Sequence, residues 1–254
     1  MIAIMSYYDI ALIAIASFFA GATNAIAGGG TFFSFPALLA VGVPPIVANA
    51  TNSVALFPAS ISSAFAFKDE LREHKFKLIF LGLVALIGAI LGALLLLHIN
   101  NQQFSTLIPY LLLFATIIFA FSNKISLFIG IKNRVKSKTI HTILSFTLLL
   151  VSIYGGFFGA GVGILLIAYL LITEVNDINQ ANALKNYLSA IFYTVSTAIF
   201  ISAGAISNKH LFIMLISSTA GGYYGAKFAK SISHKLLKNI IIIVGLGISI
   251  YYFK

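Results

Sequence analysis

The chain contains no cysteine and no tryptophan, and only six of its 254 residues are acidic. The lack of cysteine excludes disulfides, thiolate nucleophiles and cysteine metal sites. The histidines share no metal-ligand spacing and fall at the ends of apolar segments or between them: His74, His98, His141, His210 and His234. No His, Asp or Glu falls in the middle of an apolar segment, where an intramembrane enzyme would need a general base. We therefore expect no metal, no cofactor and no catalytic residue.

Charged residues make up only 9% of the chain, whereas hydrophobic residues make up 60%. Soluble domains are about half apolar, so the composition predicts an all-α polytopic membrane protein. Its single transmembrane domain would cover residues 1–254, with the lipid bilayer as its surroundings. A net charge of +10 would suggest a nucleic-acid partner in a soluble protein. Here the Lys and Arg residues fall in short loops, where they fix orientation, so we expect no nucleic-acid site.

Three consecutive glycines, Gly28, Gly29 and Gly30, interrupt the first apolar stretch. Each lowers helix stability by about 1 kcal/mol relative to alanine. Irregular backbone at membrane depth persists only where it is buried in protein or lines a water-filled cavity, so the break is a candidate binding site. No strand is expected before it and no Lys-Ser/Thr pair follows it, which argues against a nucleotide site.

The glycine break and the polar stretch after it occur again about 133 positions later. Coincident leucines would mean little in so apolar a chain, but paired glycines and a repeated Ala-Asn-Ala indicate a duplication. The matches are Ala27, Gly28 and Gly30 with Ala160, Gly161 and Gly163; Ala48, Asn49 and Ala50 with Ala181, Asn182 and Ala183; and Gly88 and Gly92 with Gly221 and Gly225. The same shift pairs Asn52 with Lys185 and Ser53 with Asn186.

Each half is expected to contain about five helical segments, the first two forming a glycine-broken hairpin. The predicted segments are about 9–27, 31–41, 46–67, 78–97 and 104–121, then about 141–158, 164–172, 178–203, 211–228 and 240–253. The first repeat then covers about 8–122, a basic linker about 123–139, and the second repeat about 140–254.

Loop charges predict the orientation. The Lys68–Lys77, Lys124–Lys138 and Lys227–Lys238 stretches are basic and should be cytoplasmic, while the turns near His98 and Gly204 should face outside. The hairpin of each half crosses the membrane either twice or not at all, which is an even number in both cases. The three remaining helices of the half cross once each, so each half makes an odd number of crossings in total. The two repeats are then inverted, an arrangement typical of secondary transporters with a site near the midplane.

Lys185 falls about two turns into an apolar helix, where a cation costs at least about 2.5 kcal/mol unless it faces a cavity or a partner. One interpretation is that Lys185 faces a bound anion, together with the N–H groups of the short helices that begin after each break. The alternative is that it extends to the cytoplasmic surface, or pairs there with Asp177 or Glu174.

Other polar side chains lie in the first turns of the third helix of each half. Amides between membrane helices either bind substrate or hold helices together, and both roles remain open for these asparagines. For Thr51 we favour a structural role, because threonine can bond back to its own helix. The candidate substrate-binding set is Gly28, Gly29, Gly30, Asn49, Thr51, Asn52, Ser53, Gly161, Gly163, Asn182, Lys185 and Asn186.

The run from Gly21 to Ser53 resembles the signature of the sulfite exporter TauE/SafE family of bacterial inner-membrane permeases. The matching residues are Gly21, Gly28, Gly29, Gly30, Pro36, Gly42, Pro44, Ala48, Thr51 and Ser53, with a weaker echo over 159–163 and 181–186. The resemblance implies a multi-pass protein of the bacterial inner membrane that exports or takes up small sulfur anions such as sulfite, sulfonates or sulfoacetate.

Together these features predict a permease that moves a small anion by alternating access and is not an enzyme. Two alternatives remain: an intramembrane enzyme, for which only Ser or Lys185 could act as nucleophile or base, and a transporter of an unrelated small metabolite.

Overall fold

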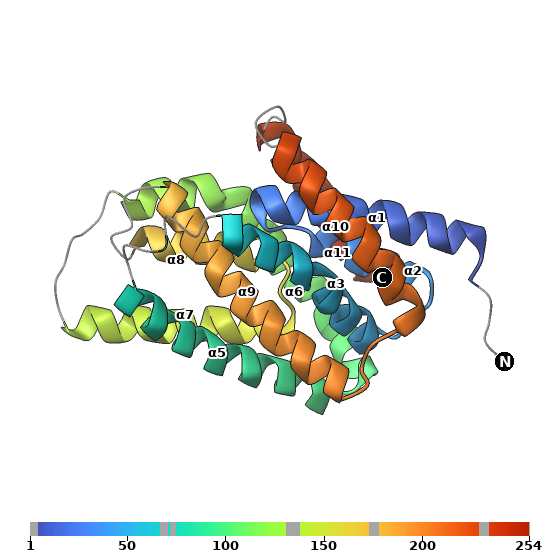
Figure 1. Cartoon of the computed structure of the whole chain (residues 1–254), viewed down its shortest axis with the longest axis horizontal. Helices are drawn as coiled ribbons and strands as arrows, with labels where there is room; N and C mark the ends of the chain where they lie inside the picture. Colours follow the sequence, from blue (N-terminus) through green and yellow to red (C-terminus); the bar gives the residue numbers. More distant parts are fainter. Residues whose placement is uncertain are drawn as a thin grey trace.

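A computed structural model describes residues 5–66, 71, 75–130, 138–172, 178–228 and 234–253. Within these residues the fold is entirely helical, which confirms the predicted all-α class (Figure 1). The helices are α1 (Tyr7–Ala27), α2 (Thr31–Ala40), α3 (Pro45–Ala66), α5 (Lys75–His98), α6 (Asn101–Gly130), α7 (Lys138–Phe157), α8 (Val162–Ile172), α9 (Ile178–Ser202), α10 (Asn208–Phe228) and α11 (His234–Tyr252).

Local sequence explains where α1 begins and ends. Ser6 and Asp9 form a reciprocal capping box at its start, which satisfies two backbone N–H groups. At its end Gly28 adopts a left-handed conformation with φ of 78°, and its N–H bonds back to the carbonyls of Thr23 and Asn24. Glycine reaches this conformation without steric cost, so the first of the three glycines ends the helix.

The end of α6 was predicted incorrectly. We expected it near residue 121, followed by a linker, but the helix continues to Gly130. The stretch from Ser122 to Ile129 is more polar yet contains neither glycine nor proline, so nothing in the backbone stops the helix before Gly130. Most of the linker that we expected at 123–139 is therefore helical, and its centre, 131–137, lies outside the described residues.

Both helices that follow a glycine break are short. Helix α2 has 10 residues and α8 has 11, which correspond to about 15 and 16 Å at 1.5 Å per residue. The hydrocarbon core of a bilayer is about 30 Å thick. Each short helix can therefore cross only about half of it.

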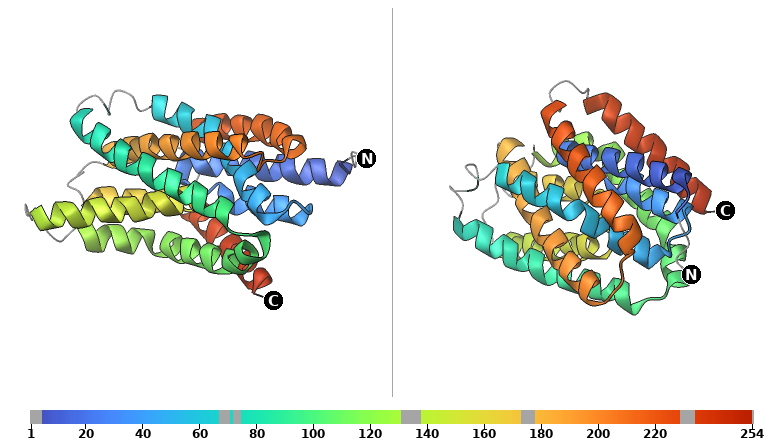
Figure 2. Two further views of the ribbon diagram at one scale, coloured as in Figure 1. Left: turned by 90° about the horizontal axis from the view of Figure 1, so that it is seen from below. Right: turned by 45° about the vertical axis from the view of Figure 1, so that its right-hand side comes forward.

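Helix packing is reciprocal between the two halves of the sequence (Figures 1 and 2). Helix α1 packs along α10 and α7 along α5, while α3 crosses α9 at the centre. Helix α2 contacts α11, and α8 contacts α6. A shift of about 133 positions converts α1–α10 into α7–α5 and α2–α11 into α8–α6, and it maps α3–α9 onto itself, as expected of related repeats.

Glycines allow the α1–α10 and α5–α7 pairs to approach closely. A β-carbon on Gly221 would overlap the carbonyl oxygen of Phe18, and one on Gly88 would overlap the side chain of Ser152. Gly88 and Gly221 are related by the repeat, so the same residue performs the same packing role in both halves. Small residues at such contacts are typical of helices that associate in lipid.

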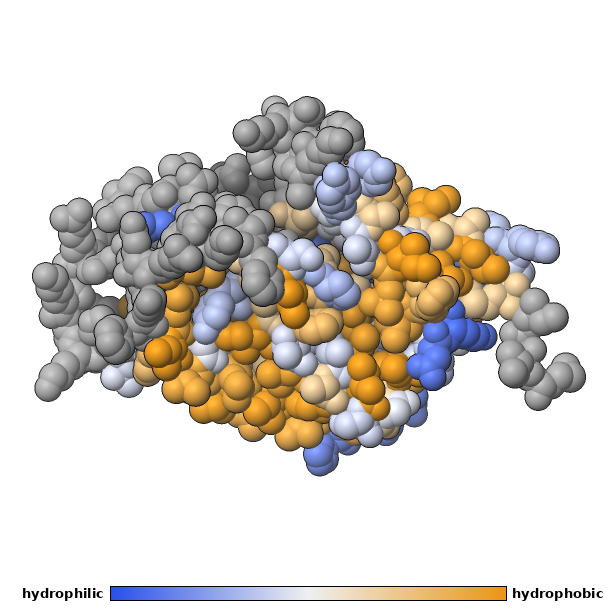
Figure 3. Space-filling view, in the orientation of Figure 1, coloured by the Kyte–Doolittle hydropathy of each residue, from blue (hydrophilic) through white to orange (hydrophobic). Residues whose placement is uncertain are grey.

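The surface of the helices is strongly apolar. Large side chains such as Phe146, Phe212 and Ile243 are each at least 60% exposed, and apolar residues cover most of the described face in Figure 3. Two of the described helices are long and apolar enough to cross a membrane by length and composition alone, over Tyr7–Ala25 and Leu78–His98. An apolar exterior around a helical core is what a bilayer requires.

Candidate functional site

The two glycine breaks meet. Gly28 and its counterpart Gly161 both have positive φ, 78° and 69°. A β-carbon on Gly28 would lie 3.1 Å from the Cα atom of Gly163, so the backbone of one break rests against the other. The short helices α2 and α8 begin at this contact, and helix N-termini carry partial positive charge.

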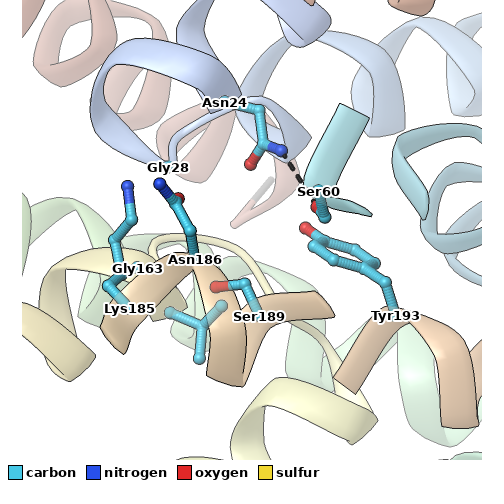
Figure 4. A pocket seen from close by; sticks show the side chains of 9 residues that line it. Asn24, Gly28, Ser60, Gly163, Lys185, Asn186, Ser189 and Tyr193 are labelled. Atoms are coloured by element: carbon cyan, nitrogen blue, oxygen red, sulfur yellow. Dashed lines mark hydrogen bonds between the residues drawn. The ribbon is translucent and has the colours of Figure 1, made fainter. Parts of the chain in front are cut away.

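A small cavity of about 10 Å³ lies beside this contact. That volume is enough for about one water molecule. Figure 4 shows Lys185 and Asn186 extending from α9 towards the first break, with Asn24 and Ser60 on another side. The lining residues are Asn24, Gly28, Ser60, Val162, Gly163, Lys185, Asn186, Ser189 and Tyr193.

Lys185 is the cation of the cavity and is only 3% exposed. The side chain therefore does not extend to the protein surface, which was one alternative. Among the described residues the only acidic side chain is Asp9, which caps α1, so no described carboxylate neutralises Lys185. The proposed partners Glu174 and Asp177 lie outside the described residues.

The counterpart of Lys185 in the first half has quite different surroundings. Asn52 is fully buried, its Nδ2 donates to Thr31 Oγ1 at 3.1 Å, and its Oδ1 accepts from the hydroxyl of Ser34. The repeat places Ile164 and Ile167 where the first half has Thr31 and Ser34. Helix α8 thus offers Lys185 no polar side chain at these positions, so its charge is left to the cavity.

One polar lining residue of the cavity, Asn24, has an aromatic counterpart in the second half, Phe157. Phe158 packs edge to face on Phe35 with ring centroids 5.4 Å apart, and Phe157 packs on Phe104 at 5.7 Å. The counterpart of Phe157 is Asn24, which lines the cavity. The two halves therefore differ at this position, which is an amide beside the cavity in the first half and an aromatic ring packed on Phe104 in the second.

Comparison with known proteins identifies the family. The family model described as sulfite exporter TauE/SafE matches residues 13–252. The chain belongs to the TauE/SafE family. Among relatives, a probable membrane transporter protein of Haemophilus influenzae is 29% identical over 92% of this chain and 91% of its own length. The probable membrane transporter protein YfcA of Escherichia coli is 28% identical over 89% of this chain and 82% of its own.

A further TauE/SafE relative, the probable membrane transporter protein ORF9 of a Sinorhizobium species, is 25% identical over 97% of this chain and 93% of its own length. No solved structure matches the chain. The family match over residues 13–252 covers both glycine breaks and the residues that line the cavity.

Four of the predicted site residues of this TauE/SafE protein line the cavity: Gly28, Gly163, Lys185 and Asn186. Gly29 and Gly30 are buried in the first break, and Gly161 lies next to Ala115 in the second. The side chain of Asn182 is outside the described set.

The other predicted residues lie in helix contacts away from the cavity lining. Asn49 Nδ2 donates to the carbonyl of Phe157 at 2.9 Å, and Ser53 Oγ donates to the carbonyl of Asn49 at 3.0 Å. Thr51 Oγ1 donates to the carbonyl of Val47, as its predicted structural role requires, and accepts the N–H of Ser207. These bonds tie α3 to α7 and to the turn before α10.

Sequence reasoning missed five lining residues: Asn24, Ser60, Val162, Ser189 and Tyr193. The repeat could have indicated two of them, because Ser60 and Tyr193 are counterparts under the shift of 133 positions and both line the cavity. Tyr193 also lies close to the side chain of Thr31, which itself bonds to Asn52. The cavity is thereby connected to the satisfied polar cluster of the first half.

Proposed function

We propose that this TauE/SafE protein is a secondary transporter that moves a small sulfur-containing anion across the bacterial inner membrane by alternating access. Sulfite, sulfonates and sulfoacetate belong to this substrate class. The observation that carries the proposal is the buried Lys185 at a cavity between two glycine breaks, with no described carboxylate beside it. The family description and the names of the relatives support transport.

The cavity offers three kinds of attraction to an anion. Lys185 supplies a full positive charge, and the start of α8 at Val162 supplies the partial charge of a helix N-terminus. Asn186 and Ser189 supply hydrogen-bond donors around them. No described carboxylate lines the space, so nothing described opposes a negative substrate.

The present volume also fits a transport cycle. A cavity that holds only about one water is too small for a substrate anion. The anion can therefore enter only when the surrounding helices move apart. The reciprocal packing of the helices supports two inverted repeats. If each repeat adopts the conformation of the other, the protein passes between two related arrangements, as a transport cycle requires. Sites at the meeting point of broken helices are typical of such carriers.

Flux measurements test the proposal directly. We expect proteoliposomes preloaded with unlabelled sulfite to accumulate labelled sulfite faster than protein-free liposomes, and external sulfonates to compete. Uncharged sulfones of similar size should not compete, because they lack the charge that Lys185 attracts. If every sulfur anion and small carboxylate tested moves no faster than through protein-free liposomes, anion transport is refuted.

Membrane orientation gives a separate prediction. Cysteines placed at Gln102 and Asn208 should react with an impermeant thiol reagent added outside intact cells, whereas Ser137→Cys should react only after lysis. Both outer positions are exposed, while the neighbouring Asn101 and Ser207 take part in hydrogen bonds. The natural chain has no cysteine and gives no background. Labelling of Ser137→Cys in intact cells would contradict the inverted arrangement.

A further inference from the structure

The orientation of the Asn24 amide in the cavity is fixed by its neighbour. Ser60 lies on α3 and donates its single hydroxyl proton to the carbonyl of Leu56 at 3.2 Å. Its oxygen can therefore serve Asn24 only as an acceptor. Accordingly, Asn24 Nδ2 donates to Ser60 Oγ at 3.3 Å, so the NH₂ group of the amide faces Ser60.

The opposite end of the amide, Asn24 Oδ1, is then an acceptor committed to the cavity. Figure 4 shows this oxygen turned away from Ser60, on the side where Asn186 and Lys185 lie. No described side chain or backbone group donates to it. The cavity thus presents a donor-only cation, Lys185, and a carbonyl oxygen that can accept a hydrogen bond from whatever binds.

We propose that Asn24 makes the site selective for an anion that carries its own hydrogen-bond donor. Such ligands include a monoprotonated oxyanion such as hydrogen sulfite and a sulfonate that bears a hydroxyl group. An anion without a donor would place lone pairs against Asn24 Oδ1 and leave that acceptor unsatisfied. A single lysine likewise matches a single negative charge. This inference rests on the proposed function and specifies the substrate class of the same site.

Two sulfonates isolate the donor from charge and size. The anions 2-hydroxyethanesulfonate and propane-1-sulfonate have one negative charge each and differ only in a hydroxyl group where the other has a methyl group. Calorimetric titration of the purified wild-type protein in detergent should show the hydroxylated anion binding about tenfold more tightly, which corresponds to about 1.4 kcal/mol. Asn24→Leu keeps the branched shape of the side chain but removes the acceptor, so the affinity ratio should fall to about one.

Two further variants separate selection from general damage. Ser60→Ala removes the acceptor that orients the amide, so Asn24 can turn its NH₂ into the cavity and the ratio should also fall. Ser189→Ala removes a lining hydroxyl that either anion could use, so both affinities should weaken and the ratio should stay near ten. Loss of the ratio in Ser60→Ala with its retention in Ser189→Ala supports the inference even if Asn24→Leu fails to fold.

The outcomes also distinguish this inference from the transport proposal. If wild-type protein binds the two sulfonates equally and Lys185→Gln weakens both, the anion site stands but selection by Asn24 is wrong. A tenfold ratio that persists in both Asn24→Leu and Ser60→Ala would likewise overturn it. If the wild-type protein binds neither sulfonate nor sulfite, the anion site itself fails and this inference fails with it.

Discussion

Lys185→Gln should weaken the binding of sulfite at least about fivefold. A unit charge about 4 Å from an anion is worth about 4 kcal/mol at an effective dielectric constant of 20, before desolvation is subtracted. If only a quarter of that remains, the loss is about fivefold, since 1.4 kcal/mol is a factor of ten. Glutamine keeps most of the length and the polarity of lysine, so the charge is the main property removed.

Titration of the purified variants with sulfite checks this result. Lys185→Arg should restore binding only in part, because the planar guanidinium needs more room than an ammonium group in a cavity this small. Lys209→Gln is the matched control, since Lys209 is exposed at the start of α10 and loses the same charge away from the cavity. Affinity that is unchanged in Lys185→Gln would remove this residue from the site.

Gly221→Leu should abolish the native packing of α1 on α10. Even a β-carbon at this position overlaps the backbone carbonyl of Phe18, and backbone cannot move aside as a side chain can. Overpacking of a buried contact typically costs about 1–3 kcal/mol, and we expect the upper end or more here because the helices must separate. The repeat predicts a comparable loss for Gly88→Leu, where Ser152 is in the way.

Thermal unfolding in detergent, followed by size-exclusion chromatography, measures this effect. Gly247→Leu is the matched control, because Gly247 is exposed on α11 and a β-carbon there meets nothing within 4 Å. The same substitution should therefore leave the unfolding temperature nearly unchanged at Gly247 and lower it sharply at Gly221 and Gly88. Equal stability of Gly221→Leu and Gly247→Leu would show that the close contact is not needed for folding.

Most helix boundaries followed from the sequence because glycines, prolines and charged loops mark them. The break at Gly28 and the start of α3 near Pro45 are examples, and both lie where a local signal predicts them. The end of α6 was missed because the prediction placed it where the apolar stretch ends. The polar residues after that point lower the hydropathy but do not stop a helix. Hydropathy therefore marked the end of the apolar stretch, whereas the helix itself continued to Gly130.

The site could be predicted only in part. Lys185 was identifiable because a cation in an apolar helix is costly wherever the chain folds. Asn24 was not, because its role depends on Ser60, which lies 36 residues away and is brought near only by the packing of α1 against α3. The repeat also suggested equal roles for Asn52 and Lys185, and only the contacts of Thr31 and Ser34 distinguish them.

The glycine contacts between helix pairs have a mechanical consequence. Helices whose backbones touch cannot slide or separate without breaking that contact, so α1 with α10, and α7 with α5, should each move as one rigid lever. Each lever takes one helix from either half of the sequence. In the proposed transport cycle, the parts that move against one another would therefore be assembled across the repeats, about the crossing of α3 and α9. Neither half expressed alone would contain a complete moving part.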